Sequence, residues 1–251
     1  MEEPAPIHNE GSRRFTPFVL LIYDLFVIRF SASRVWRCST KKFLLPLFTE
    51  NFSERHLEIG AGNGYFPTTA LTAIKNSQGG TLRKQHVTFV DLSQNSLTVS
   101  KRRVLAQHPE ADIQCVLADA VKPMPASLQS GSFDSAALYL VLQFVHGSSD
   151  DKAQAFRIAK QHLSDEGVLI GAVVLGKVWE KRESGYQIST EKRPSRLTSF
   201  ALDFYNKRGI FANLEDDPRV FDTVLREEFE EVESRIEGMV FLFSAKRPRR
   251  V

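Results

Sequence analysis

The stretch Leu57-Glu58-Ile59-Gly60-Ala61-Gly62-Asn63-Gly64 decides the fold of this 251-residue chain. It is an apolar strand that ends beside an acid and runs into a turn with glycines at alternate positions. Glycines allow a tight turn and let a ligand lie directly against the backbone. A second apolar strand, Val87–Val90, ends at Asp91, and an acid in that place can accept hydrogen bonds from both hydroxyls of a ribose. Together the two stretches predict a site for a cofactor that carries a nucleoside.

The spacing of the glycines indicates which cofactor. A dinucleotide site has the pattern Gly-x-Gly-x-x-Gly, whereas here the glycines fall at Gly60, Gly62 and Gly64. Glu58 also places a negative charge beside the turn, which would repel a pyrophosphate but suits a ligand with an ammonium group. The pattern Glu-x-Gly-x-Gly-x-Gly resembles motif I of the class I S-adenosylmethionine-dependent methyltransferases. A glycine-rich turn in some other α/β protein is the alternative interpretation.

Apolar runs alternate with helical stretches through the middle of the chain. Strands are expected at His56–Ile59, His86–Val90, Ile113–Leu117, Ser135–Val141 and Gly167–Val174. Helices are expected at about Pro17–Phe30, Thr40–Phe52, Phe66–Asn76, Gln94–Gln107 and Asp150–Leu163. Strands that alternate with helices predict a parallel, doubly wound sheet.

After Val174 this alternation stops. A polar, charged stretch, two helices and a pair of strands are expected at Gly176–Arg196, Leu197–Lys207, Pro218–Phe229, Glu231–Ile236 and Met239–Ala245. An end of this kind resembles the methyltransferase sheet, whose last strand inserts antiparallel. We therefore expect an α/β fold with a doubly wound, Rossmann-like, mostly parallel seven-stranded sheet, an antiparallel last strand and a helical N-terminal cap.

The chain length suits one domain with additions. We expect a single methyltransferase domain at 15–245, between a disordered tail at 1–14 and a basic tail at 246–251. Within the domain, residues 15–53 form the N-terminal cap and residues 176–212 form a lid or insert. Basic ends of this kind are usually solvated, and a nuclear-import signal or contact with an acidic surface is the alternative.

Composition excludes several classes of protein. The net charge of +3 is small, so no nucleic-acid partner is expected. Cys38 and Cys115 fit neither a disulfide framework nor a metal site, which predicts reduced thiols in a cytoplasmic protein without a metal. The acidic start, Met1-Glu2-Glu3, argues against a secretory leader. The run Phe18–Phe30 is shorter than the about 20 apolar residues of a spanning helix, so a core-facing helix is expected, with a membrane-surface helix as the alternative.

The resemblance to motif I implies a role for each strand end. The three glycines of the turn would pack against the methionine part of S-adenosyl-L-methionine, with Glu58 near its ammonium group. Asp91 would accept hydrogen bonds from the ribose hydroxyls, and Leu92 would lie against the adenine.

The third expected strand is followed by Ala118-Asp119-Ala120. An acid here resembles the family's adenine-contacting acid, which accepts a hydrogen bond from the exocyclic amine. The resemblance therefore assigns Asp119 and Ala120 to the cofactor site. For Asp119 taken alone, a helix-capping role is the alternative.

The fourth expected strand should end where the transferred methyl group lies. Tyr139, Gln143 and His146 lie on this strand or directly after it and are the candidate catalytic residues. A neutral imidazole can take a proton near neutral pH, so His146 is the candidate general base. Gln143 cannot act as a base, and we favour positioning of the reactants over base catalysis.

Three further segments carry a closer resemblance. They are Tyr23-Asp24, Val35-Trp36-Arg37-Cys38-Ser39-Thr40 and Phe204-Tyr205-Asn206-Lys207-Arg208-Gly209-Ile210-Phe211. Together with the glycine turn, they resemble a group of small microbial methyltransferases, whose fungal members are often linked to secondary metabolism. The resemblance covers nearly the whole chain between its two tails. Relatives often have a histidine where this chain has Gln143, which puts a simple assignment of the base in doubt.

Aromatic side chains in these segments predict a cap over the site. Tyr23, Trp36 and Tyr205 flank the expected core, and aromatic faces attract a sulfonium cation as they attract ammonium groups. Tyr23 and Trp36 are therefore assigned to the cofactor, with simple packing as the alternative. Arg34 and Arg37 could hold a carboxylate of the substrate, and a surface role is equally compatible with the sequence.

These features predict an enzyme that transfers a methyl group from S-adenosyl-L-methionine to oxygen or nitrogen of a small molecule, in natural-product biosynthesis. One alternative is a protein of the same fold that binds the cofactor without methylating, as a cyclase or as a regulatory partner. Another is a methyltransferase that acts on a macromolecule. The substrate and the oligomeric state do not follow from the sequence.

Overall fold

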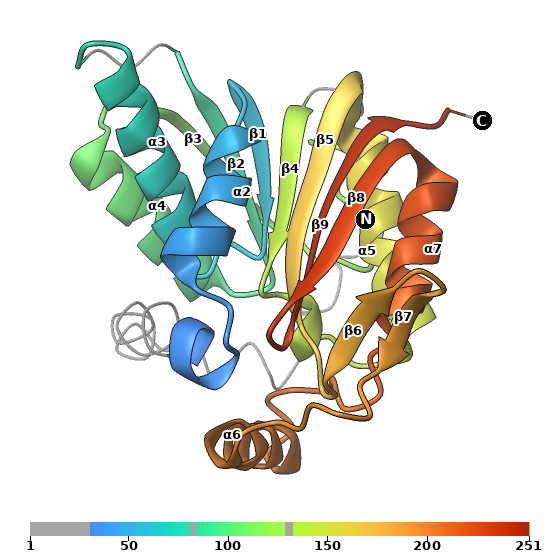
Figure 1. Cartoon of the computed structure of the whole chain (residues 1–251). Coiled ribbons are helices and arrows are strands. Elements are labelled where there is room, and N and C mark those ends of the chain that lie inside the picture. The colour runs from blue at the N-terminus through green and yellow to red at the C-terminus, as the bar shows by residue number, and fades with distance from the viewer. Residues whose placement is uncertain (1–30, 81–83, 129–132, 251) are drawn as a thin grey trace, which may run out of the picture.

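The computed structural model describes residues 31–80, 84–128 and 133–250. The expected tail at 1–14, the expected helix at Pro17–Phe30 and the predicted cofactor residue Tyr23 lie outside the described residues. Inside them, a central sheet stands between two layers of helices, as Figure 1 shows. Within these same ranges, no helix combines the length and the apolar character that are needed to cross a membrane.

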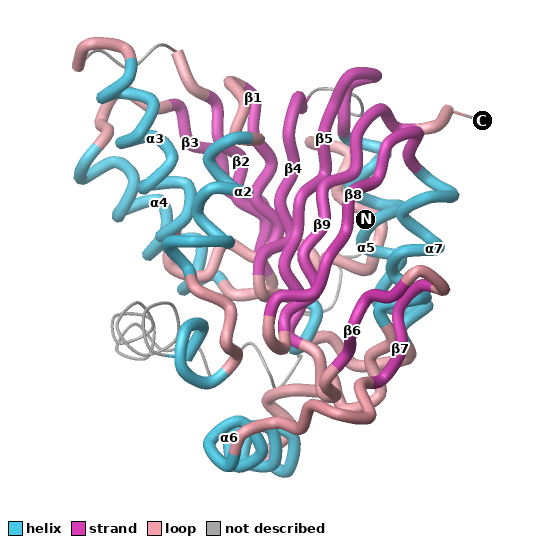
Figure 2. Tube along the Cα trace, in the orientation of Figure 1, coloured by secondary structure: helices cyan, strands magenta, loops and turns pink. Residues whose placement is uncertain are grey.

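The main sheet has seven strands in the order β3-β2-β1-β4-β5-β9-β8. Their bounds are β1 Arg55–Ile59, β2 His86–Asp91, β3 Asp112–Leu117, β4 Phe133–Tyr139, β5 Leu163–Val174, β8 Phe229–Glu237 and β9 Val240–Pro248. The first five strands pair in parallel, and β9 runs antiparallel to both of its neighbours. Figure 2 shows the strands of this sheet side by side in magenta. The expected doubly wound, mostly parallel sheet with an antiparallel last strand is confirmed.

Helices cover both faces of this sheet (Figure 1). The bounds of the α-helices in the described residues are α2 Leu45–Glu50, α3 Tyr65–Ser77, α4 Gln94–Gln107, α5 Ser149–His162, α6 Arg196–Lys207 and α7 Pro218–Glu228. The layer of α2, α3 and α4 packs on one face around Phe48 and Phe89, whereas α5 and α7 pack on the other around Phe156 and Phe243. Side chains alternate between the two faces of a strand, so each buried strand contributes side chains to the apolar clusters on both faces of the sheet.

Some boundaries differ from those expected. The expected helix at Thr40–Phe52 begins as a π-helical stretch, η3 (Thr40–Leu44), and continues as α2. β4 ends at Tyr139 because Leu140 adopts a left-handed conformation with φ of 56°, and the short 3-10 helix η4 (Leu142–Phe144) follows. The extended strand conformation therefore stops two residues before the expected end at Val141.

The segment expected to form a lid, 176–212, contains an element that the sequence did not predict. Two short strands, β6 (Trp179–Arg182) and β7 (Gly185–Ile188), form an antiparallel hairpin. Trp179 and Tyr186 are its buried side chains, and the Tyr186 hydroxyl donates a hydrogen bond to Ser234 Oγ on β8 at 2.7 Å. The hairpin thus packs beside the sheet, while α6 lies beyond the ends of the strands (Figure 1).

The prediction of a basic tail at 246–251 is partly wrong, because β9 continues through Pro248. Arg247 pairs with Glu230 at 2.9 Å, and Arg250 pairs with Asp165 at 3.0 Å. The strand continues because it stays paired with β8, where Phe229 is the register partner of Pro248. Arg247 and Arg250 also have acidic partners on neighbouring strands, so the described part of this end is not a free, solvated tail.

Trp36, close to the start of the described chain, is held by the turn between β8 and β9. The amide of Met239 donates a hydrogen bond to the Trp36 carbonyl at 2.8 Å. A Cβ on Gly238 would lie 2.3 Å from the same carbonyl oxygen, so only glycine fits this close approach. Two segments at opposite ends of the chain therefore meet next to the sheet.

Candidate active site

The glycine turn links β1 to α3 and needs its glycines. Gly60, Gly62 and Gly64 have φ values of 84°, 53° and 72°, in the left-handed region that favours glycine. A Cβ on Gly60 would lie 2.1 Å from Cγ2 of Val141, and a Cβ on Gly64 would lie 3.0 Å from Ser100. The turn therefore fits closely between the segment after β4 and α4.

Asp91 lies against this turn. Its Oδ2 accepts a hydrogen bond from the Gly62 amide at 3.3 Å, and its Oδ1 accepts one from the Ser93 amide at 2.8 Å. Burial raises the pKa of Asp91 to about 6, and hydrogen bonds from nearby backbone amides oppose the rise. A carboxylate has about four lone-pair positions, so Asp91 can hold the turn and still accept hydrogen bonds from the two hydroxyls of a ribose.

The end of β3 lies beside that of β2, because the Ala118 amide donates to the Asp91 carbonyl at 3.2 Å. Asp119 is partly buried, and its Oδ1 accepts a hydrogen bond from the Val121 amide at 3.1 Å. Leu92 and Ala120 are partly buried as well. The residues predicted to hold the ribose and the adenine therefore share one edge of the sheet. The contact of Asp119 with Val121 lies in a turn, and no helix begins at Asp119 in the described part of this segment, so the helix-capping alternative is not supported.

Glu58 is more enclosed than the sequence suggested. It is 2% exposed, and its Oε2 lies 2.9 Å from Nε2 of His56, which is fully buried. Burial raises the pKa of Glu58 well above its usual range and lowers the pKa of His56 to about 3. Sequence reasoning missed His56, although its place two residues before Glu58 on a strand puts both side chains on the same face.

Gln143 lies in η4, directly after β4, and is 2% exposed. Its Nε2 donates a hydrogen bond to the Leu140 carbonyl at 2.7 Å, whereas its buried Oε1 has no partner among the described residues. An unpaired buried acceptor costs about 1–3 kcal/mol. This oxygen is therefore a buried acceptor whose hydrogen-bonding capacity the described residues leave unused.

The other two candidate catalytic residues lie in different surroundings. His146 is exposed. Tyr139 is 4% exposed; its ring packs 5.1 Å from that of Phe48 and 5.0 Å from that of Phe66, and its hydroxyl lies 3.4 Å from the Leu44 carbonyl. This placement favours a packing role for Tyr139, on the face of the sheet that α2 and α3 cover.

An aromatic cluster joins the predicted cap to the end of β4. Phe211 is its centre, with ring centroids at 5.9 Å from Trp36, 4.7 Å from Tyr205 and 5.0 Å from Phe144 of η4. Trp36 and Tyr205 thus both contact Phe211, whereas Tyr23 lies outside the described residues. That these rings cover the cofactor stays a prediction. The role of Phe211 became visible only in the fold, because Trp36 and Phe144 are far from it along the chain.

A buried polar anchor fixes the loop that carries Phe211. Nζ of Lys152, on α5, donates to Oδ1 of Asp216 at 2.6 Å and to the Ala212 carbonyl at 2.7 Å. Asn213 donates through Nδ2 to the Val174 carbonyl at 2.8 Å, at the end of β5. Burial raises the pKa of Asp216 to about 6 and lowers that of Lys152, so the cost of burial exceeds the attraction within the pair.

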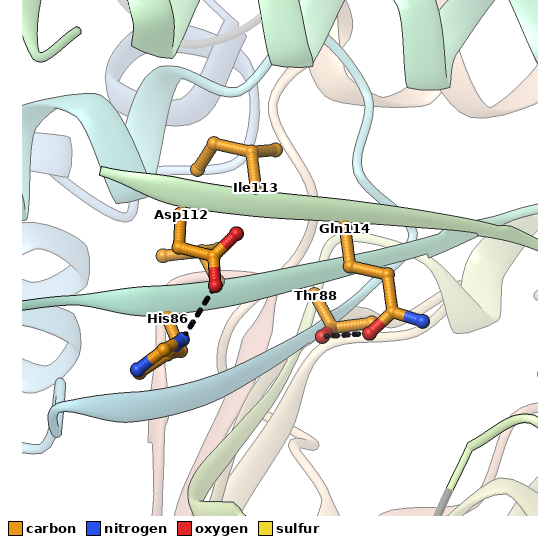
Figure 3. A pocket seen from close by; sticks show the side chains of 6 residues that line it. His86, Thr88, Asp112, Ile113 and Gln114 are labelled. Atoms are coloured by element: carbon orange, nitrogen blue, oxygen red, sulfur yellow. Dashed lines mark hydrogen bonds and ion pairs between the residues drawn. The ribbon is translucent and has the colours of Figure 1, made fainter. Parts of the chain in front are cut away.

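A separate hollow lies near the beginnings of β2 and β3, away from the strand ends that carry Asp91 and Asp119 (Figure 3). It measures about 310 Å³ and is lined by His86, Val87, Thr88, Asp112, Ile113 and Gln114. His86 begins β2, whereas Asp91 ends it, so this hollow is not part of the predicted cofactor site. In the described ranges, no cluster of three or more histidine, cysteine or acidic side chains could hold a metal ion.

This strand order and a glycine turn after the first strand define the class of protein as a Rossmann-like methyltransferase fold. A family model described as a methyltransferase domain matches residues 57–169, from within β1 into β5. Similar curated proteins are fungal. The O-methyltransferase NEC2 of Pyricularia oryzae is 35% identical and the alignment covers 94% of this chain and 92% of that protein.

Two further relatives give the same result. The methyltransferase aurB of Calcarisporium arbuscula is 36% identical over 94% of this chain and 96% of its own length. The Physcion biosynthesis cluster O-methyltransferase of Aspergillus chevalieri is 32% identical over 96% of both chains. The chain belongs to this family of fungal methyltransferases.

Solved structures with low identity share the fold. The N-methyltransferase NodS from Bradyrhizobium japonicum, in complex with S-adenosyl-l-homocysteine, has a TM-score of 0.55 at 13% identity, over 96% of this chain and 100% of that one. The cyclase SpnF has a TM-score of 0.51 at 16% identity, over 82% of this chain and 80% of that one. These likenesses extend to the fold alone.

Proposed function

We propose that this methyltransferase uses S-adenosyl-L-methionine and transfers its methyl group to an oxygen or nitrogen atom of a small molecule in natural-product biosynthesis. The observation that carries the proposal is the Asp91 carboxylate, which accepts a hydrogen bond from the Gly62 amide where β1 and β2 end side by side. The names of the relatives support the reaction, since two are O-methyltransferases and one of these carries a biosynthesis cluster in its name.

The residues at the strand ends fit the parts of this cofactor. Asp91 would accept hydrogen bonds from the ribose hydroxyls, and Asp119 would accept one from the adenine amine. Leu92 and Ala120 would supply apolar contacts to the base. The backbone of Gly60–Gly64 would lie against the methionine part, where no side chain projects from the glycines.

The methionine end needs charge complementarity. Bound S-adenosyl-L-methionine supplies an electrophilic methyl group on a positively charged sulfur. Glu58 would face the ammonium group of this cofactor, and the Trp36 ring would lie on the side of the sulfur, where an aromatic face favours a cation. A closed aromatic cap would also exclude water from the site.

In this proposal, the residues near the methyl acceptor act by positioning the substrate. The unpaired Oε1 of Gln143 is a buried acceptor near the end of β4, and a hydroxyl or N–H group of the substrate would supply the missing donor. Holding reacting groups in line supplies much of the rate enhancement in reactions of this kind. His146 is exposed, which makes it a weaker candidate for the base than its sequence position implied.

Calorimetry and product analysis test the proposal. We expect S-adenosyl-L-methionine and S-adenosylhomocysteine to bind, and NAD not to bind. The protein is then incubated with a fungal metabolite extract and methyl-labelled cofactor, and we expect mass spectrometry to find a labelled small molecule. Preparations of nucleic acid and protein serve as competing acceptors.

Each alternative function gives its own result. Cofactor binding without label in any acceptor would favour a role without methyl transfer, and label only in macromolecules would overturn the small-molecule assignment. Binding of NAD in place of S-adenosylhomocysteine would overturn the cofactor assignment.

A further inference from the structure

A chain of three hydrogen bonds runs from the backbone to Glu58. The Ser53 amide donates to Oγ of Ser135 at 3.0 Å, this oxygen lies 2.8 Å from Nδ1 of His56, and Nε2 of His56 lies 2.9 Å from Oε2 of Glu58. Ser135 is the register partner of His56 on the neighbouring strand β4. The parallel pairing of β1 with β4 therefore aligns the whole chain of contacts.

Aromatic side chains surround this series of hydrogen bonds. The ring of Phe52 lies 4.4 Å from that of His56, and the ring of Phe48 lies 5.4 Å away. The titratable groups that face Glu58 are His56 on its own strand and Tyr139 on β4, while β2 places Phe89 opposite it. His56 is the only ion-pair partner of Glu58 among the described residues, so these residues offer the carboxylate no permanent positive charge.

His56 can form a hydrogen bond with Glu58 whether the Glu58 carboxyl group is protonated or ionised. If Glu58 is protonated, its O–H donates to Nε2, and the Nδ1–H of His56 donates to Ser135. If Glu58 is ionised, the Nε2–H of His56 donates to Glu58, and the Ser135 hydroxyl donates to Nδ1. Ser135 accepts the Ser53 amide in both arrangements, and the imidazole stays neutral in both, so the second arrangement differs from the first by one proton.

We propose that His56 is a positioning residue that lets Glu58 ionise when the ammonium group of the cofactor arrives, with the imidazole proton changing from Nδ1 to Nε2 and one proton released to the solvent. This inference rests on the proposed use of S-adenosyl-L-methionine. In the free protein, burial keeps the pKa of Glu58 high and that of His56 low, which favours the uncharged arrangement. The arriving ammonium group compensates the charge that burial otherwise penalises.

The number of protons released on ligand binding tests this role of His56 and Glu58 in the unmodified protein. Calorimetry in buffers with different ionisation enthalpies counts the protons released on binding. Two ligands are compared slightly below neutral pH, where the amino group of free S-adenosylhomocysteine is largely protonated. The second ligand, 5′-methylthioadenosine, has the same nucleoside but no ammonium group, so any contribution from Asp91 is common to both. We expect S-adenosylhomocysteine to release about one proton more than 5′-methylthioadenosine.

Substitutions then assign this proton to the pair. Glu58→Gln cannot ionise, and we expect it to abolish the difference between the two ligands. His56→Gln should weaken S-adenosylhomocysteine binding about tenfold, as for a lost hydrogen bond of ordinary strength, and leave 5′-methylthioadenosine binding unchanged. His108→Gln is the control, because His108 is also buried but bonds to Thr72 on α3. It should change neither affinity.

The possible outcomes separate this inference from the proposed function. Equal proton release by both ligands in the unmodified protein would overturn the inference and leave the cofactor assignment intact. Failure of both ligands to bind would overturn both. A loss of affinity for both ligands in His56→Gln, with the proton difference preserved, would assign His56 a purely structural role and overturn the role that we propose for it.

Discussion

The Cγ2 methyl group of Val141 occupies the space into which a side chain at Gly60 would project. A Cβ on Gly60 would lie only 2.1 Å from this carbon. The contact couples the turn after β1 to the segment that follows β4, so the part of the site assigned to the cofactor and the part assigned to the acceptor share one packed boundary.

Gly60→Ala should therefore lower the free energy of unfolding by about 2–4 kcal/mol, from overpacking together with a left-handed backbone. Gly79→Ala is the matched control, because Gly79 has a φ of 74° with nothing near its Cβ position, against 84° for Gly60. It should cost about 1–2 kcal/mol. Urea unfolding measures both variants, and Gly60→Ala combined with Val141→Ala should recover part of the loss. Equal effects at the two glycines would contradict the importance of the contact.

Asp91→Ala should weaken S-adenosylhomocysteine binding by about 1–3 kcal/mol, since it leaves the ribose hydroxyls without an acceptor. It also removes the acceptor of the Gly62 amide. Calorimetry gives the affinity, and thermal unfolding checks that the variant is folded. Asp112→Ala, at the other end of the strands, is the control and should bind normally. Unchanged affinity in folded Asp91→Ala would count decisively against this cofactor site.

Lys152→Met should destabilise the protein by about 3–5 kcal/mol near neutral pH, because it leaves the buried Asp216 carboxylate without its partner. The pKa of Asp216 in the folded state, about 6, is already above its usual range, and loss of Lys152 should raise it further. The unfolded state then binds protons less tightly than the folded one, so the stability of the variant falls as the pH rises through this range.

Urea unfolding of Lys152→Met at about pH 5 and about pH 8 checks this sign. The deficit relative to the unmodified protein should be smaller at the lower pH. In Lys152→Met combined with Asp216→Leu, this pH dependence should disappear. A deficit that grows as the pH falls would show that a different group controls the stability of this loop.

Gln143→Met should raise the KM for the methyl acceptor about tenfold, because it removes the acceptor oxygen that we assign to the substrate. His146→Ala should change turnover only slightly, since its side chain is exposed. Steady-state kinetics with the identified acceptor measures both variants, and cofactor binding is the control. A loss of turnover of about 10²–10⁴-fold in His146→Ala, with normal binding, would identify a general base instead.

Much of the fold could be predicted because its signals are local. The apolar runs around Leu57 and Val87 and the strand pair near Glu237-Gly238 are visible in short windows, and β1, β2 and β3 begin or end within one residue of the expected bounds. Local patterns failed where the backbone departs from regular geometry. Nothing in the sequence near Leu140 signals its positive φ, and the hairpin of β6 and β7 is too short and too charged for a clear alternation.

The site was predicted less completely. Glycine spacing and the acid after a strand indicated Asp91 because both signals lie in the sequence. The contacts of His56 with Ser135, and of Phe211 with Trp36, join residues that are far apart along the chain. Such contacts depend on strand register and on loop placement, which a single sequence does not specify.

The hydrogen bond between the Met239 amide and the Trp36 carbonyl has a consequence for synthesis on the ribosome. About two hundred residues separate its partners, and domains form from the N-terminal side as the chain emerges. The strands that carry the glycine turn and Asp91 can pair while the rest is still being translated, but Trp36 cannot reach its final surroundings until β8 and β9 have left the exit tunnel. A nascent or C-terminally truncated chain would therefore carry the nucleoside-binding edge before it has an intact cap.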